Sequence, residues 1–231
     1  MRILALADEP NNRLWGEKCR ELLEGTDLIL SAGDLPAAYL SYLTCFTHAP
    51  ILYVHGNHDE KYRAKPPEGC ICTDGRIATV NGVRILGLGG SMRYRDGEHM
   101  YTEAEMRSRI RQVKKQIRAH GGFDVLLTHA PVKGVGDQKD LPHQGFECFQ
   151  TLLDAYRPAV MFHGHIHRSY TANFVREREW NGIPVINACG SYFFELPENG
   201  EKKGPRWYAG IQEKRVERKM NRALFGHRKQ L

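Results

Sequence analysis

The sequence predicts an α/β protein in which two mixed β-sheets pack face to face between helices. Short apolar runs alternate with helical stretches along residues 2–54, the pattern of parallel strands joined by right-handed crossovers. Asn-Gly pairs at positions 81–82 and 181–182 each separate two strand-like runs and predict β-hairpins. Parallel strands combined with hairpins require mixed sheets, with helices covering the outer faces.

The first part of the chain follows a strand, helix, strand, helix, strand order. The expected elements are a strand over residues 2–8, a helix from Asn11 or Asn12 to about residue 24, a strand ending at Asp34, a helix from Pro36 to residue 46 and a strand over residues 51–54. Asparagine caps helix N-termini, and proline suits the first helical turn. The three strands are therefore expected to be parallel.

The middle of the chain makes the sheet arrangement mixed. The expected elements are a polar loop over residues 61–69, a hairpin of strands 76–80 and 83–89, a loop over residues 89–101, a helix over residues 102–120 and a strand over residues 124–129. Thr102 and Glu105 have the spacing of a capping box and fix the start of that helix.

The last part of the predicted domain repeats these themes. The expected elements are a loop over residues 130–145, a helix to Tyr156, a strand over residues 158–163 and a hairpin of strands 174–180 and 184–188, which residues 192–196 extend. A loop as long as 130–145 inside a compact domain usually binds a ligand or acts as a lid.

Charge is distributed unevenly along the 231 residues, which suffice for one domain with a full core. The formal net charge is +6, and residues 201–231 contain ten Lys or Arg and three Glu, so the rest of the chain is nearly neutral. We expect this basic segment to be a solvated helix. The alternative is a surface that binds nucleic acid through its phosphates.

The six cysteines favour free thiols in a reducing compartment, because a chain of this size needs no disulfide framework. Asp8 and Glu9 interrupt the amino-terminal apolar run before it reaches the length of a signal-peptide core. No other stretch approaches a transmembrane span. The sequence therefore predicts a cytoplasmic protein without membrane contact, and it carries no signal for the oligomeric state.

Polar side chains follow five of the predicted strands, at the point where each strand ends. They are Asp8, Asp34, Asn57, His58, Asp59, His129, His165 and His167. Carboxylate and amide oxygens mixed with imidazole nitrogens suit divalent Mn, Fe, Zn or Co, and the set is too large for one tetrahedral site. The sequence therefore predicts two divalent metal ions about 3.5–4 Å apart, a spacing that clamps a phosphoryl group.

The order of these residues resembles the calcineurin-like metallophosphoesterase family. The resemblance is carried by Asp8, Gly33-Asp34, Gly56-Asn57-His58-Asp59, His129 and Gly164-His165-Ile166-His167. It implies a four-layer α/β/β/α sandwich, with residues 1–200 as the metallophosphoesterase domain and residues 201–231 as a basic extension. It also implies a hydrolase acting on phosphoric ester bonds, either a phosphatase or a phosphodiesterase.

The resemblance further implies a role for each matched residue. Asp34 would bridge the two metals, Asp8 and His167 would hold the first, and Asn57, His129 and His165 would hold the second. His58 would lie off the metals and protonate the leaving oxygen, and Asp59 would fix the tautomer of His58. Metal-bound hydroxide would be the nucleophile.

One position departs from the family pattern. The first motif is usually Asp-x-His, whereas here Asp8 is followed by Glu9 and Pro10, and a proline side chain cannot bind a metal. In an extended segment the Glu9 side chain points away from that of Asp8, so we expect it to be solvated. Solvent and His143 are the alternatives for the vacated position. The first metal is expected to be weakly held, differently selected or absent.

Two loops near the strand ends are expected to set substrate specificity. Arg93 and Tyr94 lie in the loop 89–101, and an arginine fork matches phosphate oxygens, so both are candidates for binding the substrate phosphate. His143 lies in the loop 130–145 and is a third candidate. Asp137 and Asp140 of the same loop are interpreted as polar loop residues.

The predicted function is metal-dependent hydrolysis of a phosphomonoester or phosphodiester by activated water. One alternative is a scaffold that retains the fold to bind phosphate or protein, with the lost histidine as the first step of decay. Another is a nuclease that uses the basic segment 201–231 to hold its substrate.

Overall fold

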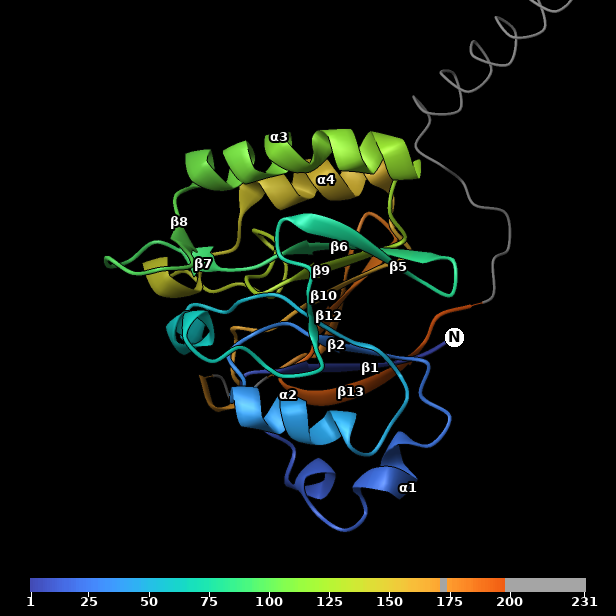
Figure 1. The fold of residues 1–231 in the computed structure, drawn as a ribbon. Coiled ribbons are helices and arrows are strands. Elements are labelled where there is room, and N and C mark those ends of the chain that lie inside the picture. Colours follow the sequence, from blue (N-terminus) through green and yellow to red (C-terminus); the bar gives the residue numbers. More distant parts are fainter. Residues whose placement is uncertain (171–173, 198–231) are drawn as a thin grey trace, which may run out of the picture.

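Two β-sheets lie face to face at the centre of the computed structural model, which describes residues 1–170 and 174–197 (Figure 1). Helices α1 (Cys19–Leu23) and α2 (Ala37–Thr44) cover one outer face, and α3 (Glu103–His120) and α4 (Glu147–Tyr156) cover the other. The described chain therefore forms the expected four-layer sandwich.

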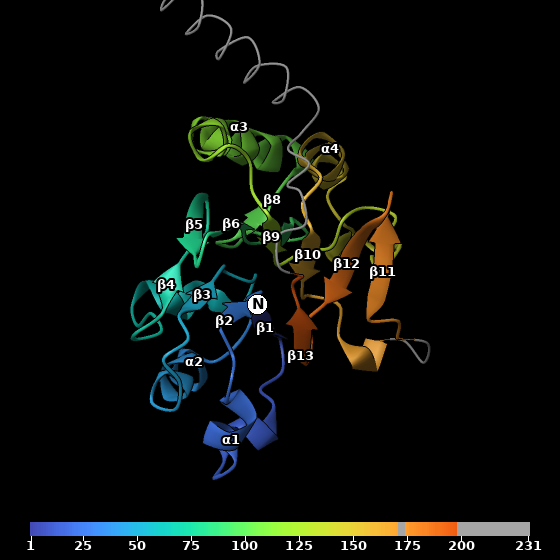
Figure 2. The ribbon, with the colours of Figure 1, turned by 90° about the vertical axis from the view of Figure 1, so that its right-hand side faces the viewer.

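The first sheet has the strand order β13-β1-β2-β3-β4. Its strands are β1 (Arg2–Ala7), β2 (Leu28–Ser31), β3 (Ile51–Tyr53), β4 (Ile71–Cys72) and β13 (Gly190–Glu195). Strands β1 to β4 are parallel to one another, and β13 pairs antiparallel with β1. Figure 2 shows β13 beside β1 at the edge of this sheet.

The second sheet has the strand order β11-β12-β10-β9-β6-β5. Its strands are β5 (Arg76–Val80), β6 (Val83–Leu88), β9 (Val125–Thr128), β10 (Val160–His163), β11 (Glu177–Trp180) and β12 (Ile183–Asn187). The four central strands are parallel, and β5 and β11 are antiparallel edge strands. Both sheets are therefore mixed, as the sequence predicts.

Three apolar layers hold the sandwich together. Residues such as Leu30, Leu52 and Leu127 fill the space between the two sheets. Ile110 and Phe149 belong to the layer between the second sheet and helices α3 and α4, and a third layer lies under α1 and α2. Burial on both faces explains why the central strands are continuous apolar runs.

Strong local signals in the sequence are confirmed. Asn81 and Gly82 have φ values of 48° and 79°, the positive pair that a tight hairpin turn needs, and the pair at 181–182 behaves in the same way. The Thr102 hydroxyl accepts from the Glu105 N–H, and the Glu105 carboxylate accepts from the Thr102 N–H. This capping box starts α3 at the predicted position.

Several predicted elements are wrong. The helix expected to run to residue 24 is broken at Gly16 into a 3-10 turn (Asn12–Trp15) and α1, and Asn11 caps only the first piece. Residues 192–196 do not extend the hairpin of β11 and β12. They form most of β13, which crosses to the other sheet because a φ of 76° at Gly190 redirects the chain.

Other short elements carry weak signals in the sequence. The loop expected over residues 61–69 begins as a 3-10 turn (Asp59–Arg63), and β4 follows it. The loop 89–101 contains β7 (Ser91–Met92) and β8 (Met100–Tyr101), which pair in parallel, and the loop 130–145 contains a 3-10 turn (Leu141–His143). A further 3-10 turn (Arg168–Tyr170) follows β10.

All six cysteines are free thiols. Among the described residues, no helix has both the length and the apolar character needed to cross a bilayer. The basic segment 201–231, and with it the predicted extension and its possible contact with nucleic acid, lies outside the described residues.

Candidate metal centre

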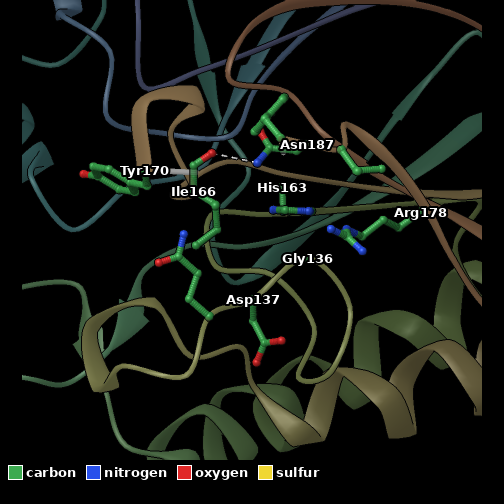
Figure 3. A pocket seen from close by; sticks show the side chains of 10 residues that line it. Gly136, Asp137, His163, Ile166, Tyr170, Arg178 and Asn187 are labelled. Carbon is green, nitrogen blue, oxygen red and sulfur yellow. Dashed lines mark hydrogen bonds between the residues drawn. The ribbon is translucent and has the colours of Figure 1, made fainter. Parts of the chain in front are cut away.

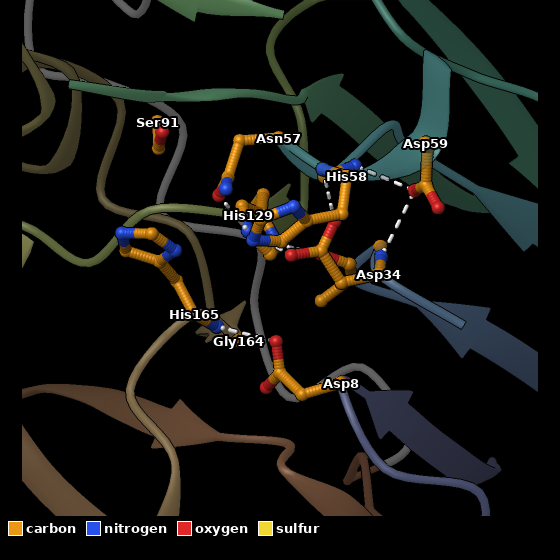
Figure 4. Close-up of polar contacts among 12 residues, drawn as sticks. Asp8, Asp34, Asn57, His58, Asp59, Ser91, His129, Gly164 and His165 are labelled. Atoms are coloured by element: carbon orange, nitrogen blue, oxygen red, sulfur yellow. Dashed lines mark hydrogen bonds and ion pairs between the residues drawn. The ribbon is translucent and has the colours of Figure 1, made fainter. Parts of the chain in front are cut away.

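The carboxyl ends of strands from both sheets meet at one point, which Figure 4 shows from close by. Asp8 follows β1, and Asp34 lies just beyond β2; both have positive φ values, 61° and 58°. Such values are uncommon outside glycine and mark turns that aim a side chain. At Gly56 a Cβ would overlap the Asp34 carboxylate, so glycine is required where these loops approach each other.

His129, which follows β9, is the centre of the group. Its fully buried ring donates from Nδ1 to the carbonyl oxygen of Ala32 at 2.7 Å. Its Nε2 lies 2.9 Å from Oδ1 of Asn57 and 3.3 Å from Oδ2 of Asp34. Because Nδ1 carries the hydrogen, a neutral ring would direct the Nε2 lone pair at two oxygen acceptors.

The charges of these groups are strongly coupled. Burial lowers the pKa of His129, but the Asp34 carboxylate more than offsets this and raises it to about 9. For Asp34, burial opposes ionisation, yet the charge and hydrogen bond of His129 bring its pKa well below the ordinary value. A divalent ion would satisfy all three donor atoms at once.

His165, just beyond β10, completes this group. Its Nε2 donates to the carbonyl oxygen of Pro142 at 2.7 Å, which leaves Nδ1 as the free lone pair. Burial and the neighbouring His129 lower its pKa to about 3, so the ring is neutral, as a metal ligand must be. Asp34, His129 and His165 each offer a ligand atom within 4.8 Å of the others.

Asp8 is held next to this group and is incompletely paired. Its Oδ1 accepts from the backbone N–H of His165 at 2.9 Å. Its Oδ2 is buried and has no hydrogen-bond partner among the residues that the structure describes. Burial raises the pKa of Asp8 to about 6, because the buried carboxylate loses the solvation of its charge. This oxygen and the donor chemistry fit a site for divalent metal ions.

His167 and Glu9 form a separate contact beside Asp8. Nδ1 of His167 lies 3.3 Å from Oε1 of Glu9. The Glu9 side chain remains exposed, as predicted, but it also turns onto His167, which was not expected. The positive φ of Asp8 breaks the extended geometry that was expected at this point of the chain.

His58 and Asp59 lie next to the candidate metal ligands. Contrary to the prediction, the Asp59 carboxylate does not pair with the His58 ring. His58 is exposed, and its backbone N–H donates to Oδ1 of Asp34 at 2.8 Å. Oδ2 of the buried Asp59 accepts from the N–H groups of Gly56 at 2.7 Å and Asp34 at 2.9 Å. Asp59 therefore supports the backbone that carries Asp34, which corrects its expected role as the partner of the His58 ring.

The loop candidates have different positions. The Arg93 guanidinium donates to Glu105 and to the carbonyl oxygen of Met100, so it secures the start of α3 and does not reach the metal candidates. Tyr94 lies close enough to Tyr170 to influence its pKa. The His143 ring centre is 5.4 Å from that of His165, and its Nδ1 pairs with Asp140. His143 is thus beside His165, which was expected to hold the second metal, whereas His143 was suggested as a replacement ligand for the first.

Two further residues at the centre escaped the sequence interpretation. Cys189 follows β12 and lies with Glu9 and His167, where their ligand atoms are within 4.8 Å of one another. Tyr170 packs against His143 and His167, with ring centres 4.8 Å apart in both cases. The strand-end rule would have found Cys189, had β12 been recognised as a parallel neighbour of β10.

A cavity of about 330 Å³ opens beside the segment 163–167 (Figure 3). His163, Tyr170 and Arg178 are among the residues that line it. Burial lowers the pKa of His163 to about 4, and the nearby Arg178 adds to this effect. Since Tyr170 also packs on His167, the cavity adjoins the candidate metal centre and brings a guanidinium to its far side.

One solved structure supports this fold. The protein TT1561 of Thermus thermophilus aligns with a TM-score of 0.57 at 18% identity, covering 82% of this chain and 89% of that chain, which supports the fold alone. A novel archaeal phosphodiesterase aligns at 0.39, 14% identity and 82% and 84% coverage. Vps29 of Chaetomium thermophilum aligns at 0.36, 14% identity and 87% and 79% coverage. The last two scores are too low to carry an argument.

No curated protein matches the sequence significantly. The profile described as "Calcineurin-like phosphoesterase superfamily domain" matches residues 1–194, which is most of the chain and includes every residue of the candidate centre. The chain therefore belongs to the calcineurin-like phosphoesterase superfamily.

Proposed function

We propose that this protein is a metal-dependent phosphoesterase that hydrolyses a phosphomonoester or a phosphodiester. The observation that carries the proposal is the convergence of Asp34, Asn57, His129 and His165 from four strand ends, with His129 Nε2 2.9 Å from Asn57 Oδ1 and 3.3 Å from Asp34 Oδ2. Their donor set is that of a borderline divalent ion such as Mn, Fe, Zn or Co.

Each of these residues has a task that follows from its surroundings. Asn57, His129 and His165 would hold one metal. Asp34, which lies 3.3 Å from His129 and close enough to Asp8 to add to the effect of burial in raising the pKa of Asp8, would be shared with a second. The carbonyl oxygens of Ala32 and Pro142 fix the ring orientations of the two histidines. Bound metals would polarise the phosphoryl oxygens and acidify a water molecule.

His58 is the proposed proton donor to the leaving oxygen. Its ring is exposed at the rim of the centre, where a substrate would approach, and its backbone is anchored by the hydrogen bond to Asp34. An imidazole titrates near neutrality and can therefore donate a proton in the operating range of an enzyme. His143, whose ring centre is 5.4 Å from that of His165, and Tyr94, which lies near Tyr170, are the proposed contacts for the substrate.

Hydrolysis of chromogenic esters tests the proposal. The full-length chain is assayed with a nitrophenyl phosphomonoester and a bis-nitrophenyl phosphodiester in the presence of Mn²⁺, and we expect turnover of at least one. Asp34→Asn and His129→Ala should each abolish it. His48→Ala is the matched control, because His48 is exposed near the opposite, amino-terminal end of β3 and should retain full activity.

Pro10, in place of the usual histidine, favours a second candidate, a scaffold that binds phosphate without turning it over. The same assay separates the two functions. Metal bound at the centre, measured by elemental analysis, together with no hydrolysis of either ester, would support the scaffold and refute the enzyme.

A further inference from the structure

Three potential metal ligands lie beside Asp8, at the position where the family pattern has lost its histidine. The Glu9 carboxylate, the His167 imidazole and the Cys189 thiol each offer a ligand atom, and these atoms lie within 4.8 Å of one another. The carboxylate is exposed, the imidazole is half-buried and the thiol is buried. An ion could therefore enter from the solvent side and reach the thiol.

The backbone brings Glu9 and Cys189 together from distant parts of the chain. The Glu9 N–H donates to the carbonyl oxygen of Ala7 at 2.6 Å across Asp8, whose φ is 61°, so the chain turns sharply after β1. Cys189 forms a parallel β-bridge with Ala7 just after β12. The turn therefore directs Glu9 toward the strand end that carries the thiol.

The orphaned Oδ2 of Asp8 is a second, independent sign of a ligand here. Asp8 is 8% exposed, and this oxygen has no hydrogen-bond partner within the described part of the chain. A buried, unpaired carboxylate oxygen is unfavourable unless a cation or a proton accompanies it. Asp8 lies close enough to His167 and Cys189 for their charges to affect one another. An ordinary Glu9–His167 ion pair leaves this oxygen unexplained.

We propose that Glu9, His167 and Cys189, with Asp8, form a thiolate-containing site for zinc or a similar borderline divalent ion. The inference rests on the proposed function, since this site would hold the first of the two metals of the phosphoesterase. Metal binding at the site can nevertheless be measured independently of hydrolysis. Zinc ligands at about 2.0–2.3 Å from the ion lie about 3.3–3.8 Å or more from one another, so modest side-chain rotations would bring the observed group to that separation. A thiolate selects zinc or cobalt over magnesium and manganese.

Cobalt substitution tests the site directly. Co²⁺ bound to a cysteine thiolate gives an intense near-ultraviolet charge-transfer absorption that oxygen and nitrogen ligands do not give. Titration of the metal-stripped, full-length chain should produce this band, saturating near one equivalent per chain, and Cys189→Ser should remove it. Cys148→Ser is the matched control, because this thiol is also buried but lies in helix α4, and it should keep the band.

Absence of the band in the wild type, or its persistence in Cys189→Ser, would overturn the proposal. Circular dichroism shows whether Cys189→Ser has folded. If it has not, His167→Gln provides the test, because it changes a half-buried side chain. We expect this variant to bind Co²⁺ at the thiolate site at least about tenfold more weakly, the lower end of the loss seen even for groups outside the ligand shell.

His129→Ala distinguishes failure of this site from failure of the proposed function. It removes a ligand of the other metal and should abolish hydrolysis while the charge-transfer band persists. A wild type with the band and no hydrolysis would refute the phosphoesterase but support the thiolate site. Hydrolysis without the band would refute the thiolate site alone.

Discussion

His58 and Asp59 are adjacent in sequence, but their surroundings give them separate tasks. The His58 ring is exposed, and only the backbone N–H of this residue supports Asp34, a contact that any side chain would preserve. Asp59 is 3% exposed, and its carboxylate pairs with two backbone N–H groups. Removing the His58 side chain should therefore lower the catalytic rate, and removing the Asp59 side chain should lower the stability of the fold.

We expect His58→Ala to lower kcat by about 10²–10⁴-fold, the range for loss of a general acid, and to change the free energy of unfolding by less than about 0.5 kcal/mol. Asp59→Ala leaves the N–H groups of Gly56 and Asp34 unpaired and should lower the free energy of unfolding by about 2–4 kcal/mol. Steady-state kinetics and urea denaturation measure the two effects. Equal destabilisation by both variants would contradict this division.

The sequence located the polar residues at the strand ends well, because each follows an apolar strand and a glycine or a turn. Asp34, Asn57, His129 and His165 were predicted in this way, and the structure brings them together. The contact of Glu9 with His167 was not predicted, because the positive φ of Asp8 has no reliable signature in the sequence of a non-glycine residue. Side-chain pairing is equally hidden: nothing local indicates that Arg93 binds Glu105.

At the scale of elements, local chemistry was predictable and long-range pairing was not. The Asn81-Gly82 turn and the Thr102 capping box each depend on a few neighbouring residues, and both are confirmed. The partner of β13 is β1, at the other end of the domain. The apolar pattern of residues 192–196 is equally compatible with a third strand added to the hairpin and with an edge strand of the opposite sheet. The sequence pattern therefore does not identify the partner strand.

Asp74 joins three elements and gives the fold a dependence on pH. It pairs with His55 beyond β3 and Arg109 on α3, and it accepts from the Gly89 N–H beyond β6. Burial raises the pKa of Asp74, but its hydrogen bond from His55 and the charge of Arg109 prevail and lower it to about 2. Because the folded pKa lies below the unfolded one, ionised Asp74 stabilises the fold above about pH 4.

That stabilisation should disappear as the pH falls from about 4 through about 2. We expect the difference in unfolding free energy between wild type and Asp74→Asn to shrink by roughly 2 kcal/mol across this window. Denaturant titrations at pH 6 and at the lowest accessible pH measure the change. Thr73→Ala, a neighbouring buried substitution that removes no titrating group, should show a constant difference. A constant difference for Asp74→Asn would refute the assignment.

For the whole molecule, the candidate metal centre is also a link between the two sheets. Asp8, Asp34 and Asn57 come from strands of the first sheet, whereas His129 and His165 come from the second. The contacts that already cross between the sheets here include His129 to Ala32 and His165 to Asp8. A metal site built from both sets of ligands can form only when the two sheets are packed together. Metal binding must therefore stabilise the folded sandwich relative to the unfolded chain.

Metal should therefore raise the thermal stability of the whole domain. At a free concentration about 100 times its dissociation constant, a ligand that binds only the folded state adds about 2.7 kcal/mol. For a chain of this size that corresponds to a rise in Tm of roughly 5–10 °C. Scanning calorimetry should show one cooperative unfolding transition. Its Tm should rise when Mn²⁺ or Zn²⁺ is added and return to the starting value when a chelator is added. His48→Ala should retain the shift and His129→Ala should lose most of it; an equal shift in both would mean that the metal binds elsewhere.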